Sequence, residues 1–160
     1  MFGTKQKKIC AVADGEAIAI DKVPDEVFAS RMLGDGFAVE PERGEIVSPV
    51  DGEITGITEA KHAYTITSKD GLEILVHIGI DTVALGGSGF EPLVREGSRV
   101  KVGDPIARVD LSFVKDSGYQ TVIPVVVTNA DELGIRDLSF TFGSVKGGKS
   151  TVALYSAPRG

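Results

Sequence analysis

The sequence predicts an all-β fold, either an antiparallel β-sandwich or a barrel-sandwich hybrid, with an internal duplication and one short helix. Three observations favour this class. The 160 residues include 20 glycines, against a usual share of about 7%, which indicates many tight turns. Short runs rich in Val, Ile and Thr alternate with these turns, as is typical of strands. Two pairs of similar segments also recur along the chain.

Strand patterns run through the whole chain, and its length predicts a single domain of residues 1–160 with an ordered core of about 8–155. Alternating or β-branched runs occur at residues 8–13, 17–19, 37–41, 45–49, 52–59, 62–67, 72–78, 99–100, 105–109, 121–127 and 151–155. A helix is predicted only at 24–33, where Pro24 stands near the first turn and Gly34 follows the last. The two ends, 1–7 and 157–160, are expected to fray.

The repeated segments predict the duplication. Residues 9–16 resemble residues 46–53, and residues 97–103 resemble residues 143–148. Each copy places a turn beside β-branched residues. Two similar half-motifs can pack face to face so that each covers the apolar side of the other.

The charge and the cysteine content exclude some functions. The formal net charge is −6 and the pI is about 4.9, so the protein repels nucleic-acid phosphates and no nucleic-acid partner is expected. Cys10 is the only cysteine, which excludes an intrachain disulfide and favours the reducing cytoplasm. No stretch approaches the roughly 20 apolar residues that span a bilayer, so direct membrane insertion is not expected.

The only two histidines, His62 and His77, fall on the two arms of a predicted β-hairpin. The residues between the arms, Ser-Lys-Asp-Gly at 68–71, are typical of a turn. If all four form the loop, the two histidines lie directly opposite each other, with Cβ atoms roughly 5 Å apart. A two-residue turn instead places His62 opposite Gly79 and makes the rings diagonal neighbours on one face. Facing histidines suggest proton, metal or phosphoryl chemistry, and two unrelated strand histidines are the alternative.

His77 stands in an almost wholly apolar strand, two residues before Gly79. The glycine removes a side chain from the same face and leaves a backbone carbonyl free to hold a ring N–H of His77. A hydrogen bond to Nδ1 would fix the tautomer and leave Nε2 as a nucleophilic lone pair. A β-bulge at Gly79 is the structural alternative.

Residues 71–83 form a wider pattern around this histidine: a glycine, an apolar strand and then His-apolar-Gly-apolar-x-Thr-apolar. The pattern resembles the phosphorylation-site signature of the glucose-type IIA family of the bacterial phosphoenolpyruvate:sugar phosphotransferase system. Other landmarks of that family follow in family order: Val27-Phe28-Ala29, Gly34-Asp35-Gly36, Ser48-Pro49-Val50-Asp51-Gly52, Lys61-His62-Ala63, Gly89-Phe90-Glu91 and residues 96–105. Together they cover residues 9–154, nearly the whole chain.

The resemblance implies a role for each histidine. His77 matches the residue that the phosphohistidine of the carrier protein HPr phosphorylates, giving tele-phosphohistidine, before the group passes to a cysteine of a IIB domain of a membrane sugar permease. His62 matches the second histidine of the family, which supports transfer without being the acceptor. Regulatory protein partners are implied, and no cofactor is. The short segment after Met1 favours a free-standing cytoplasmic protein, with a domain of a larger permease as the alternative, and the sugar is left unspecified.

Further residues are expected to line the site. Asp35 and Asp81 match acidic family positions and suit a basic partner, although two solvated loop acids are the alternative. Gly79 and Thr82 belong to the signature itself. The apolar residues expected to surround the histidines and exclude water, or simply to belong to the core, are Val39, Val47, Leu75, Ile78 and Val83.

The chain departs from the family pattern at one position. The family often has threonine two residues before the supporting histidine, where this chain has Ala60. The hydroxyl contact from that position is lost. Thr58, Thr65, Thr82 or a water molecule are the candidates to replace it.

Two other functions are weighed against the phosphocarrier. A zinc-binding β protein would need three or four protein ligands, so only opportunistic zinc at His62 and His77, completed by a partner, is expected, and no metal is required. A non-catalytic biotinyl- or lipoyl-like hybrid domain would share the turn at 96–106, but the Met-Lys-Met motif that presents biotin is absent.

Overall fold

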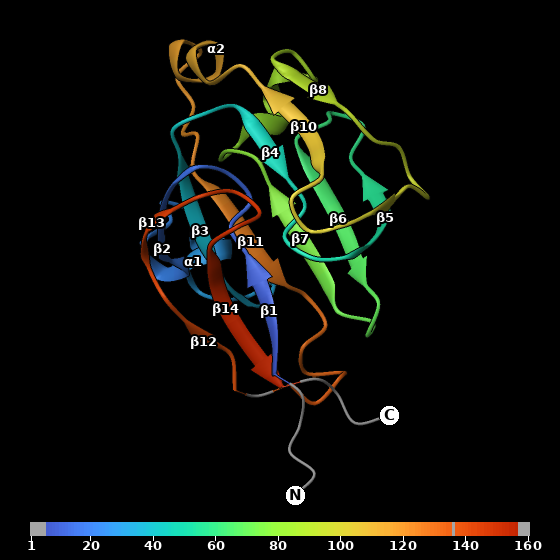
Figure 1. The fold of residues 1–160 in the computed structure, drawn as a ribbon. Helices are drawn as coiled ribbons and strands as arrows, with labels where there is room; N and C mark the ends of the chain where they lie inside the picture. Colours follow the sequence, from blue (N-terminus) through green and yellow to red (C-terminus); the bar gives the residue numbers. More distant parts are fainter. Residues whose placement is uncertain (1–5, 136, 157–160) are drawn as a thin grey trace, which may run out of the picture.

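Antiparallel strands carry most of the architecture (Figure 1). The computed structural model of the protein describes residues 6–135 and 137–156. Its strands are β1 (Gln6–Cys10), β2 (Gly15–Ala19), β3 (Asp35–Pro41), β4 (Glu45–Val47), β5 (Gly52–Ile57), β6 (Ala63–Ser68), β7 (Glu73–His77), β8 (Phe90–Pro92), β9 (Arg99–Val100), β10 (Pro105–Val109), β11 (Ile123–Val127), β12 (Ser139–Phe140), β13 (Gly143–Val145) and β14 (Thr151–Ser156).

The strands form three sheets. The largest has eight strands in the order β13-β2-β3-β11-β7-β6-β5-β9, and two three-stranded sheets have the orders β1-β14-β12 and β4-β10-β8. The all-β, antiparallel class predicted from the sequence is confirmed. Strands β8, β12 and β13, of two or three residues each, were not predicted.

The prediction of a single helix over 24–33 is wrong in two respects. Helix α1 spans only Glu26–Ala29, because Arg31, two residues beyond it, adopts the left-handed φ of 63°. The second helix, α2 (Leu111–Asp116), was missed because it is too short to show a helical period. Two 3-10 turns, η1 (Ile20–Lys22) and η2 (Thr82–Leu85), complete the helical structure of the described residues.

The duplication is visible in matched hydrogen bonds. The repeated segments lie side by side, since Cys10 N donates to Pro49 O at 3.0 Å and Val47 N donates to Val12 O at 2.8 Å. The two copies of the first repeat, 9–16 and 46–53, also bind the two copies of the second repeat, 143–148 and 97–103, through equivalent aspartates. Asp14 Oδ1 accepts from Gly147 N at 2.8 Å, and Asp51 Oδ1, 37 positions later, accepts from Val102 N at 2.8 Å.

The eight-stranded sheet buries apolar side chains on both of its faces. One face meets the main core, which includes Ile74 and Val76 of β7. The other face carries a smaller cluster beneath η1 and α1, formed by Ile20, Val23, Phe28, Ala38, Ile80, Val122 and Val126, with Leu75 packed against it. Because side chains alternate along a strand, His77 of β7 lies on the face with Leu75, under α1.

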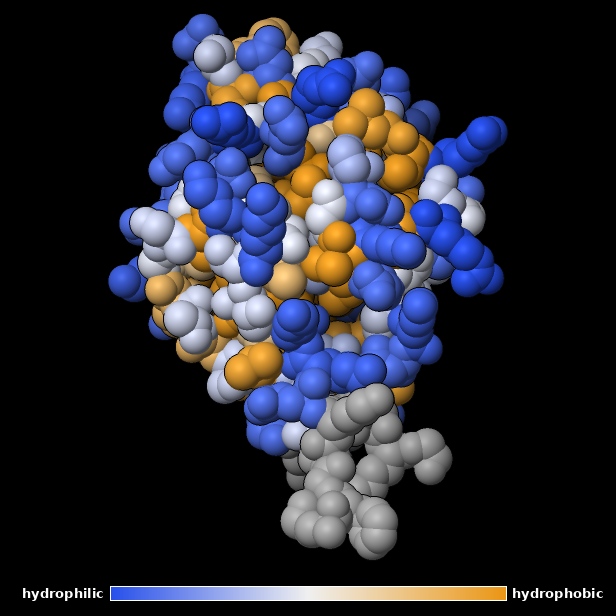
Figure 2. All heavy atoms as spheres, viewed as in Figure 1, coloured by the Kyte–Doolittle hydropathy of each residue, from blue (hydrophilic) through white to orange (hydrophobic). Residues whose placement is uncertain are grey.

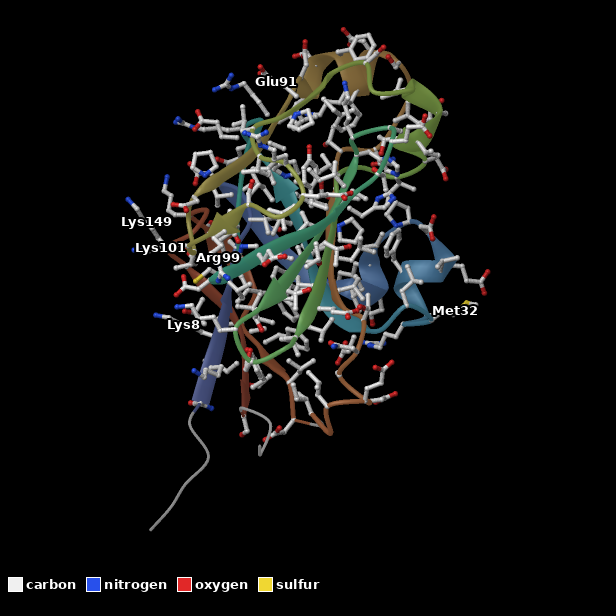
Figure 3. All side chains as sticks on the ribbon, turned by 90° about the vertical axis from the view of Figure 1, so that its right-hand side faces the viewer. Lys8, Met32, Glu91, Arg99, Lys101 and Lys149 are labelled. Carbon is white, nitrogen blue, oxygen red and sulfur yellow. The ribbon has the colours of Figure 1, made fainter. Side chains whose placement is uncertain are left out.

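The surface shows where charge gathers. Apolar residues on the face in Figure 2 are interrupted by hydrophilic ones. In Figure 3, Lys8, Arg99, Lys101 and Lys149 lie along one edge of the molecule, and Met32, just beyond α1, lies at the opposite edge. These four cations therefore lie away from Met32, three residues beyond α1.

The ends of the chain were expected to fray. Gln6 and Lys7 instead pair with β14, and the rest of that prediction, at 1–5 and 157–160, falls outside the described residues. Among the described helices, none has the length and apolar character needed to cross a membrane.

Candidate functional site

The imidazoles of His62 and His77 are neighbours. Their ring centroids lie 4.8 Å apart, and the ring planes make an angle of 85°, so one ring presents its edge to the face of the other. The expectation that the hairpin brings the two rings together is confirmed.

The register that produces this contact differs from both predicted registers. Ala63 pairs with His77, and Ser68 N donates to Leu72 O at 2.8 Å, so the loop has three residues, 69–71. His62 lies just before β6, where its carbonyl oxygen accepts from Ile78 N at 2.7 Å. Lys61, with φ 64°, turns the chain there, which frees the His62 side chain from the strict alternation of a strand and lets it reach His77.

The backbone carbonyl of Gly79 fixes the proton of His77. Nδ1 of His77 lies 2.6 Å from Gly79 O, and since a carbonyl only accepts, Nδ1 carries the proton and donates. Nε2 of the neutral ring is then a free lone pair. Gly79 adopts φ +82°, and a Cβ there would lie 2.5 Å from Thr82 Cγ2 and 2.8 Å from Gln120 O. Only glycine therefore places the carbonyl here.

His62 is held through its own Nδ1. Thr58, one residue beyond β5, places its Oγ1 3.2 Å from His62 Nδ1. His62 is 6% exposed. Burial, reinforced by the nearby charge that His77 would carry when protonated, lowers the pKa of His62 to about 4.

Burial also lowers the pKa of His77. The carbonyl of Gly79 and the negative charges of Asp25 and Asp81 oppose this lowering without cancelling it. Both imidazoles are consequently neutral near neutral pH, as a nitrogen nucleophile requires.

Apolar side chains shield the pair of rings from one side and leave it open on the other. The ring of Phe28, 5% exposed, packs with its centroid 5.0 Å from that of His77. Beside His62 a shallow hollow of about 390 Å³ opens to the surface, lined by Thr58, Glu59, Ala60, His62, Val83 and Gly86. The exposed side chain of Val83 lies in this hollow, and Val27 is exposed on α1. A partner can therefore reach the histidines from this side.

Two neighbouring imidazoles do not make a complete metal site. Among residues 6–135 and 137–156, no group of three or more His, Cys, Asp or Glu side chains is arranged to hold a metal ion. Opportunistic zinc at His62 and His77, completed by a partner's carboxylate, stays a prediction.

Comparisons with known proteins identify the family. The sequence model of the phosphoenolpyruvate-dependent sugar phosphotransferase system, EIIA 1, matches residues 7–133. The chain belongs to this family. The resemblance noted in the sequence is thereby confirmed.

Relatives and a solved structure agree with membership in the EIIA 1 family. The chain is 46% identical over 128 residues to a glucose-specific EIIA component of Bacillus cereus, covering 80% of this chain and 78% of that protein. It is 45% identical over 130 residues to a glucoside-specific EIICBA component of Staphylococcus carnosus, covering 81% of this chain and 19% of that protein. The structure of glucose permease IIA from Mycoplasma capricolum matches with a TM-score of 0.86 and 40% identity, covering 96% of this chain and 98% of that chain.

Several residues that the EIIA 1 signature pointed to lie beside the histidines. Gly79 contacts His77, and the charge of Asp81 acts on that ring. Leu75 packs with Phe28 in the smaller cluster, and Val83 lines the hollow beside His62. Thr82 supports the site from within, since it is fully buried and donates to Ile78 O at 2.6 Å. The side chain of Ile78, also predicted to line the site, packs in the main core.

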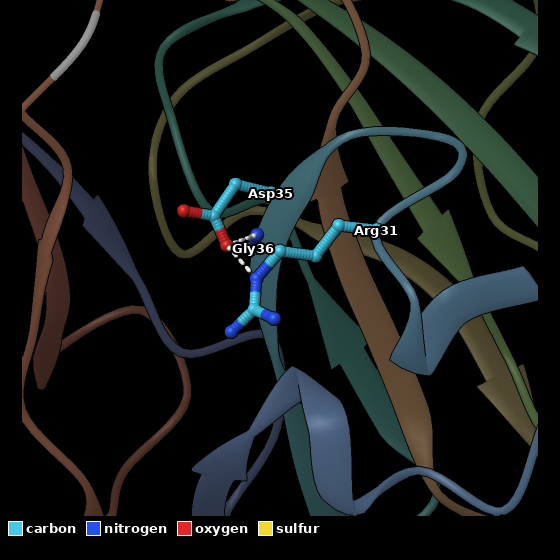
Figure 4. Close-up of polar contacts among 3 residues, drawn as sticks. All are labelled: Arg31, Asp35 and Gly36. Carbon is cyan, nitrogen blue, oxygen red and sulfur yellow. Dashed lines mark hydrogen bonds and ion pairs between the residues drawn. The ribbon is translucent and has the colours of Figure 1, made fainter. Parts of the chain in front are cut away.

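Three predicted lining residues lie elsewhere. Val39 faces the main core, on the opposite side of the sheet from Phe28, and Val47 of β4 pairs with Pro105. Asp35 forms an ion pair with Arg31 at 3.1 Å and accepts from Gly36 N at 2.8 Å (Figure 4). Asp35 pairs with Val127 of β11, and Val127 pairs with Ile74 of β7. Ile74 lies three residues before His77, roughly 10 Å along the strand.

Two residues of the site were missed as site residues. Asp25 caps α1 by accepting from Val27 N at 2.9 Å, and its charge acts on His77, as that of Asp35 does not. Phe28 stands in the landmark Val27-Phe28-Ala29, which was the available indication that this helix belongs to the site. In the sequence Asp25 is only an acidic residue at the start of the predicted helix, so nothing there indicated its effect on His77.

Proposed function

We propose that the protein is a cytoplasmic phosphocarrier of the sugar phosphotransferase system in which Nε2 of His77 holds the phosphoryl group. One observation carries this proposal: Nδ1 of His77 is bound to Gly79 O at 2.6 Å, which leaves Nε2 as the nucleophile, beside a second neutral imidazole. A neutral imidazole attacks phosphorus near neutral pH, and its phosphoramidate stays reactive enough to pass the group on.

The reaction needs no proton transfer at His77. The nitrogen–phosphorus bond of phospho-HPr breaks while Nε2 of His77 bonds to phosphorus, and Nδ1 keeps the proton that it donates to Gly79. In the second step a IIB cysteine thiolate attacks phosphorus, and the Nε2–phosphorus bond breaks. Gly79 therefore holds the ring in one orientation through both steps.

Charge must be stabilised as the phosphoryl group arrives, because it adds up to about two negative charges. His62 lies in ring contact with His77 and is the neighbouring donor for the phosphoryl oxygens. A hydrogen bond to a charged group is worth roughly 1.5–3 kcal/mol, and it helps most where charge spreads over the equatorial oxygens. Phe28 shields the phosphohistidine from water.

The surface around the rings suits a protein partner with an apolar centre and basic charges. Val83, 59% exposed, lies in the hollow beside His62, and Val27, 43% exposed, lies on α1 next to Phe28, so apolar area is free near the histidines. Asp25 and Asp81 add negative charge beside His77. We assign this face to HPr and to the IIB domain in turn.

The names of the relatives bear on the partner and the sugar. The Staphylococcus carnosus relative carries its EIIA part in one EIICBA chain, which supports a IIB domain as the acceptor. Relatives named glucose-specific and glucoside-specific match this chain equally well, so we propose glucose or a glucoside as the transported sugar, selected by the permease. Membership in the family favours this function over a biotinyl- or lipoyl-like domain.

Labelling tests the proposal. The protein is incubated with radiolabelled phosphoenolpyruvate, Enzyme I and HPr, and then with a IIB domain. We expect His77→Ala to take up no label, and His62→Gln to take up label but to pass it to IIB roughly tenfold more slowly, since a flexible amide replaces the fixed imidazole N–H donor. Asp35→Asn, remote from the rings, is the control and should behave as wild type. Equal labelling of His77→Ala and wild type would refute the assignment.

A further inference from the structure

Thr58 is joined to the supporting histidine by a hydrogen bond that the phosphocarrier reaction does not by itself explain. The residue follows β5, and its backbone N donates to Ala63 O at 3.0 Å while its carbonyl accepts from Lys61 N at 2.9 Å. These bonds close the tight turn that carries His62. The Thr58 side chain is therefore fixed against the ring and not free on the surface.

The partners of the Thr58 hydroxyl indicate which way its proton points. Oγ1 accepts from Ala63 N at 3.1 Å. Its single hydrogen has two acceptors in reach: His62 Nδ1 at 3.2 Å and Ala63 O at 3.4 Å. The nearer acceptor is Nδ1. When the hydroxyl donates to Nδ1, the neutral ring of His62 carries its own proton on Nε2.

The two histidines then hold opposite tautomers. In His77, Nδ1–H donates a hydrogen bond to the carbonyl of Gly79, so Nε2 is an acceptor. In His62, Nδ1 accepts a hydrogen bond from the Thr58 hydroxyl, so Nε2–H is a donor. Within the described residues neither Nε2 has a hydrogen-bond partner, so both free ring edges belong to the site. The pair presents one nucleophile and one donor to a single phosphoryl group.

We propose that Thr58 is a positioning residue, which holds His62 in the Nε2–H tautomer so that this edge donates to the phosphoryl oxygens on His77. The inference rests on the proposed phosphocarrier function. It also answers which residue replaces the hydroxyl that is missing at Ala60. The hydroxyl of Thr82 donates its hydrogen bond to Ile78 O at 2.6 Å, and the side chain of Thr65 lies against Gly56. Of the three candidate threonines, only Thr58 forms a hydrogen bond with the His62 ring.

The test compares substitutions of similar size. Thr58→Val removes the hydroxyl and keeps the branched shape, whereas Thr58→Ser keeps the hydroxyl. Thr55→Val is the matched control, because Thr55 lies on the same segment and its hydroxyl bonds to Thr67 Oγ1 at 2.9 Å, away from the histidines. The readouts are the NMR chemical shifts of the His62 ring nitrogens, which report the tautomer, and the rate of transfer from labelled protein to a IIB domain.

We expect a single Nε2–H tautomer of His62 in the wild type, in Thr58→Ser and in Thr55→Val. In Thr58→Val the tautomers should mix, and transfer to IIB should slow by roughly five- to tenfold, the effect of one neutral hydrogen bond. An Nδ1–H tautomer in the wild type overturns the proposal without any variant, and so does a Thr58→Val protein with unchanged tautomer and rate. Loss of labelling in His77→Ala is judged separately, so failure of Thr58 leaves the phosphocarrier function standing.

Discussion

Gly79 holds the ring of His77 through a hydrogen bond, with its carbonyl oxygen 2.6 Å from His77 Nδ1. The backbone of Gly79 reaches this position at φ +82° and against the side chain of Thr82. The orientation of the reactive ring thus depends on a residue without a side chain.

Substitution of this glycine should damage both stability and transfer. In Gly79→Ala the new Cβ would lie 2.5 Å from Thr82 Cγ2 and 2.8 Å from Gln120 O, in addition to the unfavourable φ. We expect a loss of roughly 2–4 kcal/mol of unfolding free energy in urea titrations, with slower labelling of His77. Gly71→Ala is the control: φ is +89° but nothing lies within 4 Å, so only about 1 kcal/mol should be lost. Equal losses in the two variants would contradict this account.

The buried histidines make stability depend on pH. The pKa of His62 is about 4 in the folded protein against 6.5 when unperturbed, so between these values the unfolded chain binds more protons than the folded one. Stability is therefore full above about pH 6.5 and falls as the pH drops toward 4. The urea midpoint should decrease between neutral pH and about pH 5, and the decrease should be smaller in His62→Gln, which has nothing to titrate there. The same decrease in both proteins would exclude His62 as the cause.

One core tyrosine should be replaceable with a gain. The hydroxyl of Tyr64 is buried and has no hydrogen-bond partner among the described residues, and burial raises the pKa of Tyr64 to about 12. Tyr64→Phe removes an unsatisfied polar group and should raise the unfolding free energy by about 1 kcal/mol. Tyr155→Phe is the matched control, because Tyr155 donates to Asp70 Oδ2 at 3.0 Å. Loss of this hydrogen bond should lower the unfolding free energy by about 1–2 kcal/mol. Thermal unfolding should show a more stable Tyr64→Phe protein and a less stable Tyr155→Phe protein. A destabilised Tyr64→Phe protein would refute the interpretation.

Phe28 should determine how long the phosphohistidine survives. Its ring covers His77 at a centroid distance of 5.0 Å. Phe28→Leu keeps an apolar side chain but uncovers part of the ring, so the phosphorylated protein should lose its label to water several-fold faster. Phe113→Leu, at an exposed position on α2, should leave the half-life unchanged. An unchanged half-life in Phe28→Leu would show that water is excluded by other residues.

The sequence predicted the fold wherever the pattern was local and long enough. Strand β11 shows its β-branched run directly, and the similarity of residues 9–16 and 46–53 indicated the duplication. The register of the histidine hairpin was wrong because Ser-Lys-Asp-Gly permits loops of two, three or four residues. The choice of three depends in part on a contact with distant chain: Asp70 accepts from Tyr155, 85 positions away.

The site was predicted in part for similar reasons. Gly79 follows His77 by two positions, just beyond the end of β7, so their contact is local in sequence. Asp25 and Asp35 lie on either side of the same helix in the sequence, and only the packing of that helix on β7 decides which of them acts on His77. Val39 was misplaced because an apolar strand residue looks alike in sequence whichever face of the sheet it occupies.

The most direct test of the account is the position of the phosphoryl group in the intact protein. The protein is phosphorylated through Enzyme I and HPr, and NMR couplings between phosphorus and the ring nitrogens identify the bonded atom. We predict a single phosphoryl group on Nε2 of His77, with Nδ1 still protonated toward Gly79. A phosphoryl group on Nδ1 of His77, or on His62, would contradict the central claim.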